Sequence, residues 1–301
     1  MLYVILVLAS LALLGAGWFA VWFYISFVRL TARELVPGIH AVFGGGGNSL
    51  VVQDGGEILL FDTKFPPASR WLRSWIARNV GAPVTKIVNS HYHFDHTQGN
   101  TLHHQATIYT HRSVPESMMR YDEKLWRRNQ NGMPVEPNLI EEKLSLKVGQ
   151  QEVVLIHPGL GHTHGDLFVY LPRHNIVATG DLFFHNYYPF LDKTAAGASI
   201  PGLIAVLRSV ADNYPGATFL PGHGPIARAA DLRRFADYLE FLSRVVSRAI
   251  DDGLSEADTV KSVDLSEWSL SRLPILHYGQ VWSTSKSNIS SVYQILKNSS
   301  S

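Results

Sequence analysis

The sequence predicts one α/β domain that follows an apolar N-terminal segment. Residues 1–28 contain no Lys, Arg, Asp or Glu, although the chain of 301 residues carries 26 basic and 25 acidic side chains. In the remainder, short apolar strands alternate with amphipathic helical patterns, and no repeat or low-complexity linker separates them. Such alternation indicates helices packed outside β-sheets, so we expect one domain after the segment and not two.

Residues 2–28 are expected to form a transmembrane anchor. This uncharged stretch of 27 residues, as a helix rising about 1.5 Å per residue, exceeds the roughly 30 Å of the hydrocarbon core. Aromatic residues near its end, followed by Arg29 and Arg33, are typical of a membrane interface. A cleaved signal peptide is the alternative, and the absence of a basic residue before Arg29 favours the anchor. The two arginines favour a single-pass protein of the cell membrane with its domain in the cytoplasm, and a periplasmic domain stays open.

Turn signals divide the rest of the chain into predicted elements. Glycine-rich turns separate three opening strands into a β-meander, and Gly81-Ala82-Pro83 ends the first helix. The expected strands are 38–44, 49–53, 58–62, 84–88, 106–110, 152–157, 167–171, 176–178 and 217–220. The expected helices are 67–80, 113–130, 199–213, 227–252 and 287–297.

The charge balance and the cysteine count exclude several classes of function. The net charge is +1 without a block of Lys or Arg, so we expect no nucleic-acid partner, because a phosphate backbone requires a clustered basic face. The chain has no cysteine, which excludes thiolate nucleophiles and every cysteine-containing zinc site. A metal in this chain would therefore have to be held by nitrogen and oxygen atoms.

The segment from Asn89 to His96 carries four residues of metal-binding type directly after a predicted strand. His91 and His93 are two positions apart, which would place both on one side of an extended strand end. Asp95 and His96 follow where the chain turns into a helix, so they would point at a neighbouring spot. One short loop is thus predicted to supply two adjacent metal centres.

Three further strand-end turns carry residues of the same kind. They are His162 in Gly-His-Thr, Asp181 in Thr-Gly-Asp and His223 in Pro-Gly-His-Gly. Glycine beside each of them suits a backbone that turns sharply while directing a side chain inward. Any one of these residues alone would be a surface or core histidine, or an aspartate that caps a helix. Together they predict one composite site.

These motifs, in this order, resemble those of the metallo-β-lactamase-fold hydrolase superfamily over about residues 36–297. The resemblance implies a four-layer αββα sandwich of two mixed sheets with helices on the outer faces, here preceded by the transmembrane helix. It also implies a ligand set: His91, His93 and His162 for one metal, Asp95, His96 and His223 for the second, and Asp181 bridging both. Two Zn²⁺ ions are expected, with Fe or Mn as other occupants, since imidazoles and carboxylates suit these metals.

The expected activity is metal-assisted hydrolysis by a hydroxide held between two metals. Asp95 would orient the hydroxide and pass its proton to the leaving group. True β-lactamases of the superfamily have a cysteine or serine where Asp181 stands, so the chain resembles instead a broad bacterial hydrolase branch. The expected small-molecule substrate is an ester, thioester or lactone, because aromatic and not basic residues adjoin the ligand loops.

Three alternatives to this activity stay open. They are an iron-dependent oxidoreductase of the sulfur dioxygenase type on the same fold, a phosphodiesterase, and a membrane-tethered binding protein without turnover. The seven candidate ligands favour two metals, since one tetrahedral site needs about three or four. The sequence leaves the oligomeric state undetermined.

Overall fold

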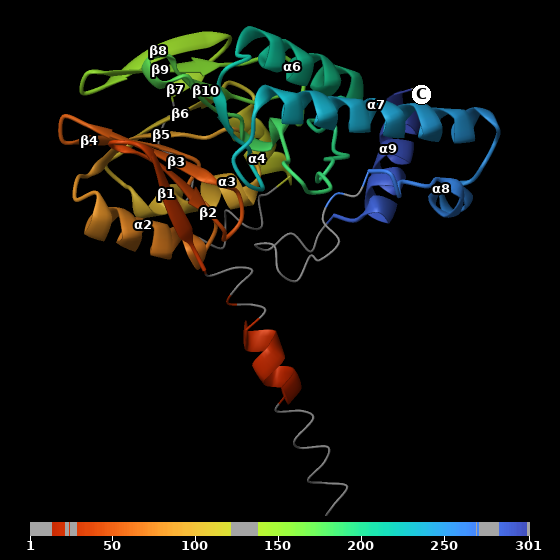
Figure 1. Ribbon diagram of the computed structural model, residues 1–301, viewed down its shortest axis with the longest axis horizontal. Helices are drawn as coiled ribbons and strands as arrows, with labels where there is room; N and C mark the ends of the chain where they lie inside the picture. Colours follow the sequence, from red (N-terminus) through yellow and green to blue (C-terminus); the bar gives the residue numbers. More distant parts are fainter. Residues whose placement is uncertain are drawn as a thin grey trace, which may run out of the picture.

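The computed structural model describes residues 14–21, 24, 29–121, 138–268, 270 and 283–299, and its strands form two sheets (Figure 1). The seven-stranded sheet contains, in spatial order, β1 (Thr31–Val36), β2 (Ile39–Phe43), β3 (Ser49–Asp54), β4 (Glu57–Phe61), β5 (Val84–Val88), β6 (Thr107–His111) and β7 (Asn138–Ile140). The five-stranded sheet contains β12 (Thr218–Leu220), β11 (Ile176–Ala178), β10 (Phe168–Leu171), β9 (Gln151–Ile156) and β8 (Lys143–Val148).

Both sheets are mixed. Strands β1 to β4 pair antiparallel, whereas β4, β5, β6 and β7 run parallel. In the second sheet, β11 and β12 run parallel and the other pairs are antiparallel. Strands β9, β11 and β12 therefore point the same way, and their carboxyl ends lie at one edge of that sheet.

Alternating side chains give each sheet two buried faces. On β4, Leu59 and Phe61 pack between the sheets, while Ile58 and Leu60 pack on the opposite side with α2 (Ala68–Asn79). This division follows from the period of two along a strand. The core between the sheets also takes residues from β9, β10, β11 and β12, so the two sheets lie face to face.

Helices cover the outer faces of this sandwich. Helix α2 lies against the seven-stranded sheet, and α6 (Ile200–Asn213) and α7 (Ala229–Asp251) lie against the other (Figure 1). The remaining helical elements are α3 (Phe94–Thr97), η2 (Gln98–Leu102), α4 (Val114–Tyr121), η3 (Pro172–His174), η4 (Gly180–Leu182), α8 (Glu256–Ser262) and α9 (Ser285–Ser299). The order helix, sheet, sheet, helix agrees with the expected four layers.

The structure contains strands and a helix that were not predicted from the sequence. Strands β1, β7 and β8 and helix α8 were not expected. The strand before the histidine motif ends at Val88, as predicted, and the side chains of His91 and His93 meet as expected, although the chain bends at His91 and Tyr92. His91 and His93 lie in the loop between β5 and α3, and His93 is the residue that precedes α3.

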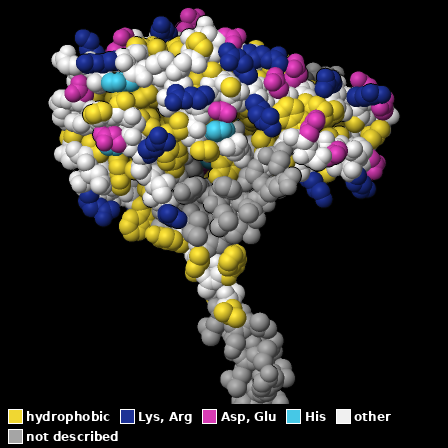
Figure 2. Space-filling model, viewed as in Figure 1, with side chains coloured by type: hydrophobic (Ala, Val, Ile, Leu, Met, Phe, Trp, Pro, Cys, Tyr) yellow, Lys and Arg dark blue, Asp and Glu magenta, His cyan; other side chains and the backbone are white. Residues whose placement is uncertain are grey.

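Most of the predicted anchor, residues 2–28, lies outside the described residues. Residues 14–21 are helical and exposed. Among the residues that the structure describes, no helix combines the length and the apolar character needed to cross a membrane. On the face of the domain shown in Figure 2, acidic and basic side chains are interspersed.

Candidate metal centre

The seven residues singled out in the sequence converge at one edge of the sandwich. His91, His93, Asp95 and His96 follow β5, His162 follows β9, Asp181 lies in η4 after β11, and His223 follows β12. Because the carboxyl ends of these strands meet at this edge, segments far apart in the sequence deliver their side chains to one place. Four of the seven side chains come from loops, two from the single turn of α3 and one from η4.

The first group contains His91, His93, His162 and Asp181, whose candidate ligand atoms lie within 4.8 Å of one another. His91 Nε2 is 2.8 Å from His93 Nδ1, and His162 Nε2 is 3.1 Å from the same Nδ1 atom. His91 and His162 are fully buried, and His93 is 9% exposed. Three ring nitrogens thus converge on one small volume.

The second group contains Asp95, His96 and His223. His223 Nε2 lies 3.4 Å from Asp95 Oδ2, and His96 Nε2 lies 3.7 Å from the same oxygen. The side chain of Asp95 is 18% exposed, whereas His96 is fully buried. This group therefore has one carboxylate that solvent can reach.

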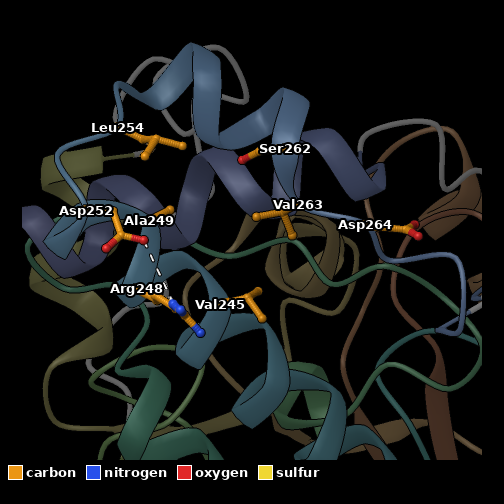
Figure 3. A pocket seen from close by; sticks show the side chains of 8 residues that line it. All are labelled: Val245, Arg248, Ala249, Asp252, Leu254, Ser262, Val263 and Asp264. Carbon is orange, nitrogen blue, oxygen red and sulfur yellow. Dashed lines mark ion pairs between the residues drawn. The ribbon is translucent and has the colours of Figure 1, made fainter.

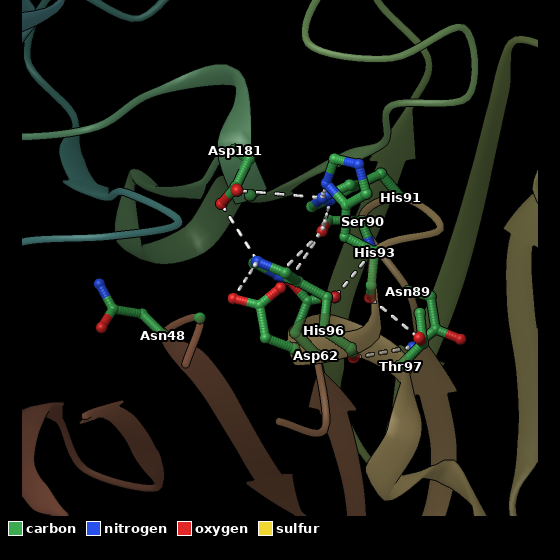
Figure 4. Close-up of polar contacts among 12 residues, drawn as sticks. Asn48, Asp62, Asn89, Ser90, His91, His93, His96, Thr97 and Asp181 are labelled. Atoms are coloured by element: carbon green, nitrogen blue, oxygen red, sulfur yellow. Dashed lines mark hydrogen bonds and ion pairs between the residues drawn. The ribbon is translucent and has the colours of Figure 1, made fainter. Parts of the chain in front are cut away.

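Asp181 lies between the two groups. Its Oδ1 is 3.1 Å from His96 Nε2 and 3.4 Å from His223 Nε2. Its Oδ2 is 3.7 Å from His162 Nε2 and 3.9 Å from His91 Nε2. One carboxylate thus faces both groups, as Figure 4 shows for Asp181, His91 and His96.

Asp62 and Ser90 contact the Nδ1 atoms of His96 and His91, on the side of each ring away from the cluster (Figure 4). Asp62 follows β4 and is fully buried; its Oδ2 is 2.7 Å from His96 Nδ1 and accepts the Ser90 hydroxyl at 2.7 Å. Because the single Ser90 proton is directed at Asp62, Ser90 Oγ accepts from His91 Nδ1, 2.9 Å away. Both histidines are therefore held with their Nε2 atoms directed at the cluster.

The loops at this edge are packed tightly against the ligand-type side chains. A Cβ atom on Gly47 would lie 2.2 Å from the His96 ring. The carbonyl of Gly47 accepts a hydrogen bond from the buried Lys64 Nζ at 2.5 Å. Asn48 Nδ2 donates to the carbonyls of Pro221 and Gly224 on either side of His223, each at 2.9 Å.

Asp62, Gly47, Asn48 and Lys64 were not among the sequence-derived site residues. Asp62 had a usable signal, because it directly follows an apolar strand, as three of the predicted site turns do. Lys64 had no such signal in the sequence. The contacts of its buried Nζ are with backbone carbonyls, those of Val42 and Gly47, and a sequence motif does not reveal such contacts.

The pKa values show which donors are available to a cation. Burial lowers the pKa of His162 to about 3 and, with His96 and His93 nearby, holds the pKa of His91 well below its usual range. Burial alone would raise the pKa of Asp181, but His223 and His96 hold that pKa well below its usual range. Neutral imidazoles and an ionised carboxylate are the forms that bind a divalent metal. Although burial alone would lower both pKa values, Asp181 and Asp95 raise the pKa of His96 and raise the pKa of His223 to about 9, so these two imidazoles would release a proton when a cation binds.

Two unsatisfied atoms indicate that a metal fits here. Within the described chain, the buried atoms His96 Nε2 and Asp181 Oδ1 lie 3.1 Å apart as an ion pair, but neither has a partner in hydrogen-bond geometry. Coordination to a cation would satisfy both atoms. The nitrogen and oxygen donors match the composition of zinc sites that lack cysteine.

The sequence of the region around this site decides the family. Residues 42–228 match the sequence pattern described as the metallo-beta-lactamase superfamily. The chain belongs to this superfamily. The family-level prediction and the predicted fold of two sheets with outer helices are confirmed.

Relatives of this superfamily member resemble it at low identity. A metallo-beta-lactamase type 2 of Bacteroides fragilis is 22% identical over 206 residues, 68% of this chain and 76% of the relative. The solved metallo-beta-lactamase from Pontibacter korlensis, 22% identical, has a TM-score of 0.57 and is matched over 70% of this chain and 99% of its own. The inverting sec-alkylsulfatase Pisa1 from Pseudomonas sp., 16% identical, has a TM-score of 0.67 over 88% of this chain and 50% of its own. These structural likenesses show the fold alone.

Aromatic residues beside the ligand loops divide into core residues and exposed ones. Phe183, Phe184 and Tyr187 are buried in the core against α6 and α7, and the Phe184 ring stacks on His223 with centroids 5.1 Å apart. Phe190 is 48% exposed, and its ring centroid lies 5.4 Å from that of His93. Phe94 is 37% exposed and packs on Phe65. Of these aromatic residues, Phe190 and Phe94 are therefore the ones that offer exposed apolar surface beside the ligand loops.

A separate hollow lies between α7 and α8 (Figure 3). It is lined by Val245, Arg248, Ala249, Asp252, Leu254, Ser262, Val263 and Asp264. Arg248 and Asp252 form an ion pair at 3.9 Å across one turn of α7. Since no lining residue belongs to the two His/Asp groups, this hollow is distinct from the candidate metal centre.

Proposed function

We propose that this superfamily member hydrolyses small acyl substrates, namely esters, thioesters or lactones, with two Zn²⁺ ions as cofactors. Seven His and Asp side chains converge at one edge of the sandwich, and one of them, Asp181, faces both groups. This arrangement carries the proposal. His91, His93 and His162 would hold one ion, Asp95, His96 and His223 the other, and Asp181 both. Fe and Mn are the other metals that this donor set would accept.

Asp95 is the proposed catalytic residue. Although burial would raise its pKa, His96 and His223 lower the pKa of Asp95 to about 2, so it is ionised at neutral pH. Among the side chains of Asp95, Asp181 and His223, that of Asp95 is the most exposed, at 18%. It can therefore accept a proton from a water molecule and return it to a leaving group. The bound metals would lower the pKa of that water and polarise the substrate carbonyl.

The basic and aromatic residues near the candidate ligands support an uncharged acyl group as the substrate. Lys86 pairs with Glu57 at 2.9 Å, and Arg228 donates to Thr218 at 2.9 Å, so both cations are engaged elsewhere. The transition state of phosphodiester hydrolysis would call for a cation beside the reacting oxygens. Phe190 and Phe94 offer apolar surface instead.

Steady-state kinetics should show a preference for acyl esters. With p-nitrophenyl acetate, butyrate and hexanoate against bis-p-nitrophenyl phosphate, we expect kcat/KM to favour an ester by roughly tenfold or more, because Lys86 and Arg228, the cations nearest to a candidate ligand in the sequence, pair with Glu57 and Thr218. A higher kcat/KM for the phosphodiester would overturn the acyl assignment and favour the phosphodiesterase.

The contribution of Phe190 can be separated in the same assay. Phe190→Ala should lower kcat/KM for the hexanoate more than for the acetate, since each buried CH₂ contributes about 0.8 kcal/mol. Trp71→Ala is the matched control, because Trp71 on α2 is equally exposed at 48% and stands away from the ligand loops. Equal losses for both chain lengths would exclude contact between Phe190 and the acyl chain.

We also propose that residues 2–28 anchor the protein in the cell membrane, with the domain in the cytoplasm. The charge-free length and the following Arg29 and Arg33 support the anchor and its orientation. Membrane fractionation, N-terminal sequencing and protease access to sealed vesicles test this. We expect an intact N-terminus in the membrane fraction, and soluble protein that begins near residue 20 would show a cleaved signal peptide instead.

A further inference from the structure

Asp192 is a buried carboxylate that the proposed reaction does not use. It lies in the connection between η4 and α6 and is 3% exposed. Its Oδ2 accepts the Tyr92 hydroxyl and the Thr194 hydroxyl, the latter at 3.1 Å, and its Oδ1 accepts the Thr194 backbone N–H at 2.9 Å. His93 Nε2 lies 3.3 Å from Oδ2. With these donors around it, Asp192 is an acceptor only, which is the ionised form.

The backbone fixes this carboxylate in place. The carbonyl of Asp192 accepts the N–H of Ala198 at 2.8 Å, and a Cβ atom on Gly197 would lie 2.4 Å from that carbonyl oxygen. The carbonyl of Ala196 accepts the N–H of His164 at 2.9 Å. The loop that carries Asp192 is thus closed on itself and tied to the loop that carries His162.

The position of Asp192 determines which nitrogen of His93 carries the proton. An acceptor beside Nε2 requires a proton on Nε2, which leaves the lone pair on Nδ1. That Nδ1 atom is the one that meets His91 and His162, at 2.8 and 3.1 Å. His91 and His162 meet it through Nε2, so His93 needs the opposite tautomer from theirs.

We infer that Asp192 is a positioning residue for the metal held by His91, His93 and His162, because it keeps His93 in the Nε2–H tautomer and its Nδ1 directed at the metal. This inference rests on the proposed metal-dependent function. Its dependence is confined to the metal, since the contact between Asp192 and His93 Nε2 is present without the metal.

The tautomer can be measured without any substitution at Asp192. In the full-length chain, stripped of metal and labelled with ¹⁵N-histidine, we expect the His93 signal of a protonated Nε2. His93→Gln identifies this signal by its loss. An unprotonated Nε2 on His93 in the wild-type protein would overturn the inference.

Asp192→Asn tests the consequence for metal binding. If the amide oxygen keeps the Thr194 N–H, the amide NH₂ faces His93 Nε2 and moves the imidazole proton to Nδ1. Competitive titration with Zn²⁺, and with Co²⁺ followed by its absorption spectrum, should show one metal bound roughly 10–100-fold more weakly, the range for loss of a group that orients a ligand. The second metal should keep its affinity.

Two variants serve as controls in these titrations. Tyr92→Phe removes one donor to Asp192 but leaves Asp192 beside His93, so its loss of affinity should be much smaller. Asp212→Asn removes an exposed partner of Arg233 and should bind as the wild type does. A folded Asp192→Asn protein with the wild-type tautomer and both wild-type affinities would refute the role of Asp192. A wild-type chain that binds fewer than two metals would refute the proposed function instead, while the tautomer measurement still decides the role of Asp192.

Discussion

Asp181→Asn is expected to bind one metal instead of two and to lose roughly 100-fold or more in kcat/KM. The carboxylate uses one oxygen toward His96 and His223 and the other toward His91 and His162. The amide keeps one oxygen and replaces the other by NH₂, which carries no lone pair for a metal. Removal even of a group that only orients a ligand costs 10–100-fold, so a bridging ligand should cost at least the upper end. Elemental analysis and ester kinetics measure both effects.

The stability gained on adding Zn²⁺ separates loss of metal from misfolding. Without metal, Asp181→Asn should fold but unfold at a lower temperature than the wild type, because it removes a buried charge that faces His96 and His223. With excess Zn²⁺ the wild type should gain more stability than the variant, because a ligand that binds only the folded state shifts unfolding by mass action. Asp237→Asn is the control, since Asp237 is an exposed partner of Arg208. Unchanged metal content together with an unchanged rate would show that Asp181 does not bridge two metals.

Much of the architecture could be predicted because its strands have strong local signals. The strands β3 and β4 contain continuous apolar runs bounded by glycine or aspartate turns, and β5 follows the turn Gly81-Ala82-Pro83. Strand β8 was missed although Leu144, Leu146 and Val148 alternate with polar residues. Strand β1 gave a weaker signal, because three of its six residues are exposed at the sheet edge and none is buried.

The seven candidate ligands could be predicted, whereas their supports could not. The ligand-type residues stand in short motifs with glycine or with one another, so local spacing reveals them. Asp62 reaches His96 across 34 positions and Asp192 reaches His93 across 99. Such pairs depend on which strand ends the topology brings together, and a single sequence does not contain that information.

The pairing of His91 with His93 shows what the local argument left open. The period of two along an extended chain places both rings on one side, and the rings do meet after β5 ends at Val88. That period does not say which nitrogens meet, and these are His91 Nε2 and His93 Nδ1. The different nitrogens require different supports, which Ser90 and Asp192 provide.

Gly47→Ala is expected to displace His96, to remove one metal and to lower kcat/KM by roughly 100-fold. The added Cβ would lie 2.2 Å from His96 Cε1 and 2.5 Å from Nε2. Neither partner can yield easily, since Asp62 holds His96 Nδ1 at 2.7 Å and Lys64 holds the Gly47 carbonyl at 2.5 Å. Overpacking of this kind costs about 1–3 kcal/mol of stability. Metal content, ester kinetics and thermal unfolding report the three effects.

Gly216→Ala separates the contact with His96 from the general cost of replacing a glycine. A Cβ atom there would meet only Asn175 Nδ2 at 3.4 Å, an ordinary contact, and neither Gly47 nor Gly216 has a positive φ. Gly216→Ala should therefore keep both metals and the wild-type rate, and loss of conformational freedom in the unfolded chain should stabilise it by up to about 1 kcal/mol. If Gly47→Ala also kept both metals and the wild-type rate, the glycine-rich loop would not constrain His96, and Asp62 alone would have to orient that ring.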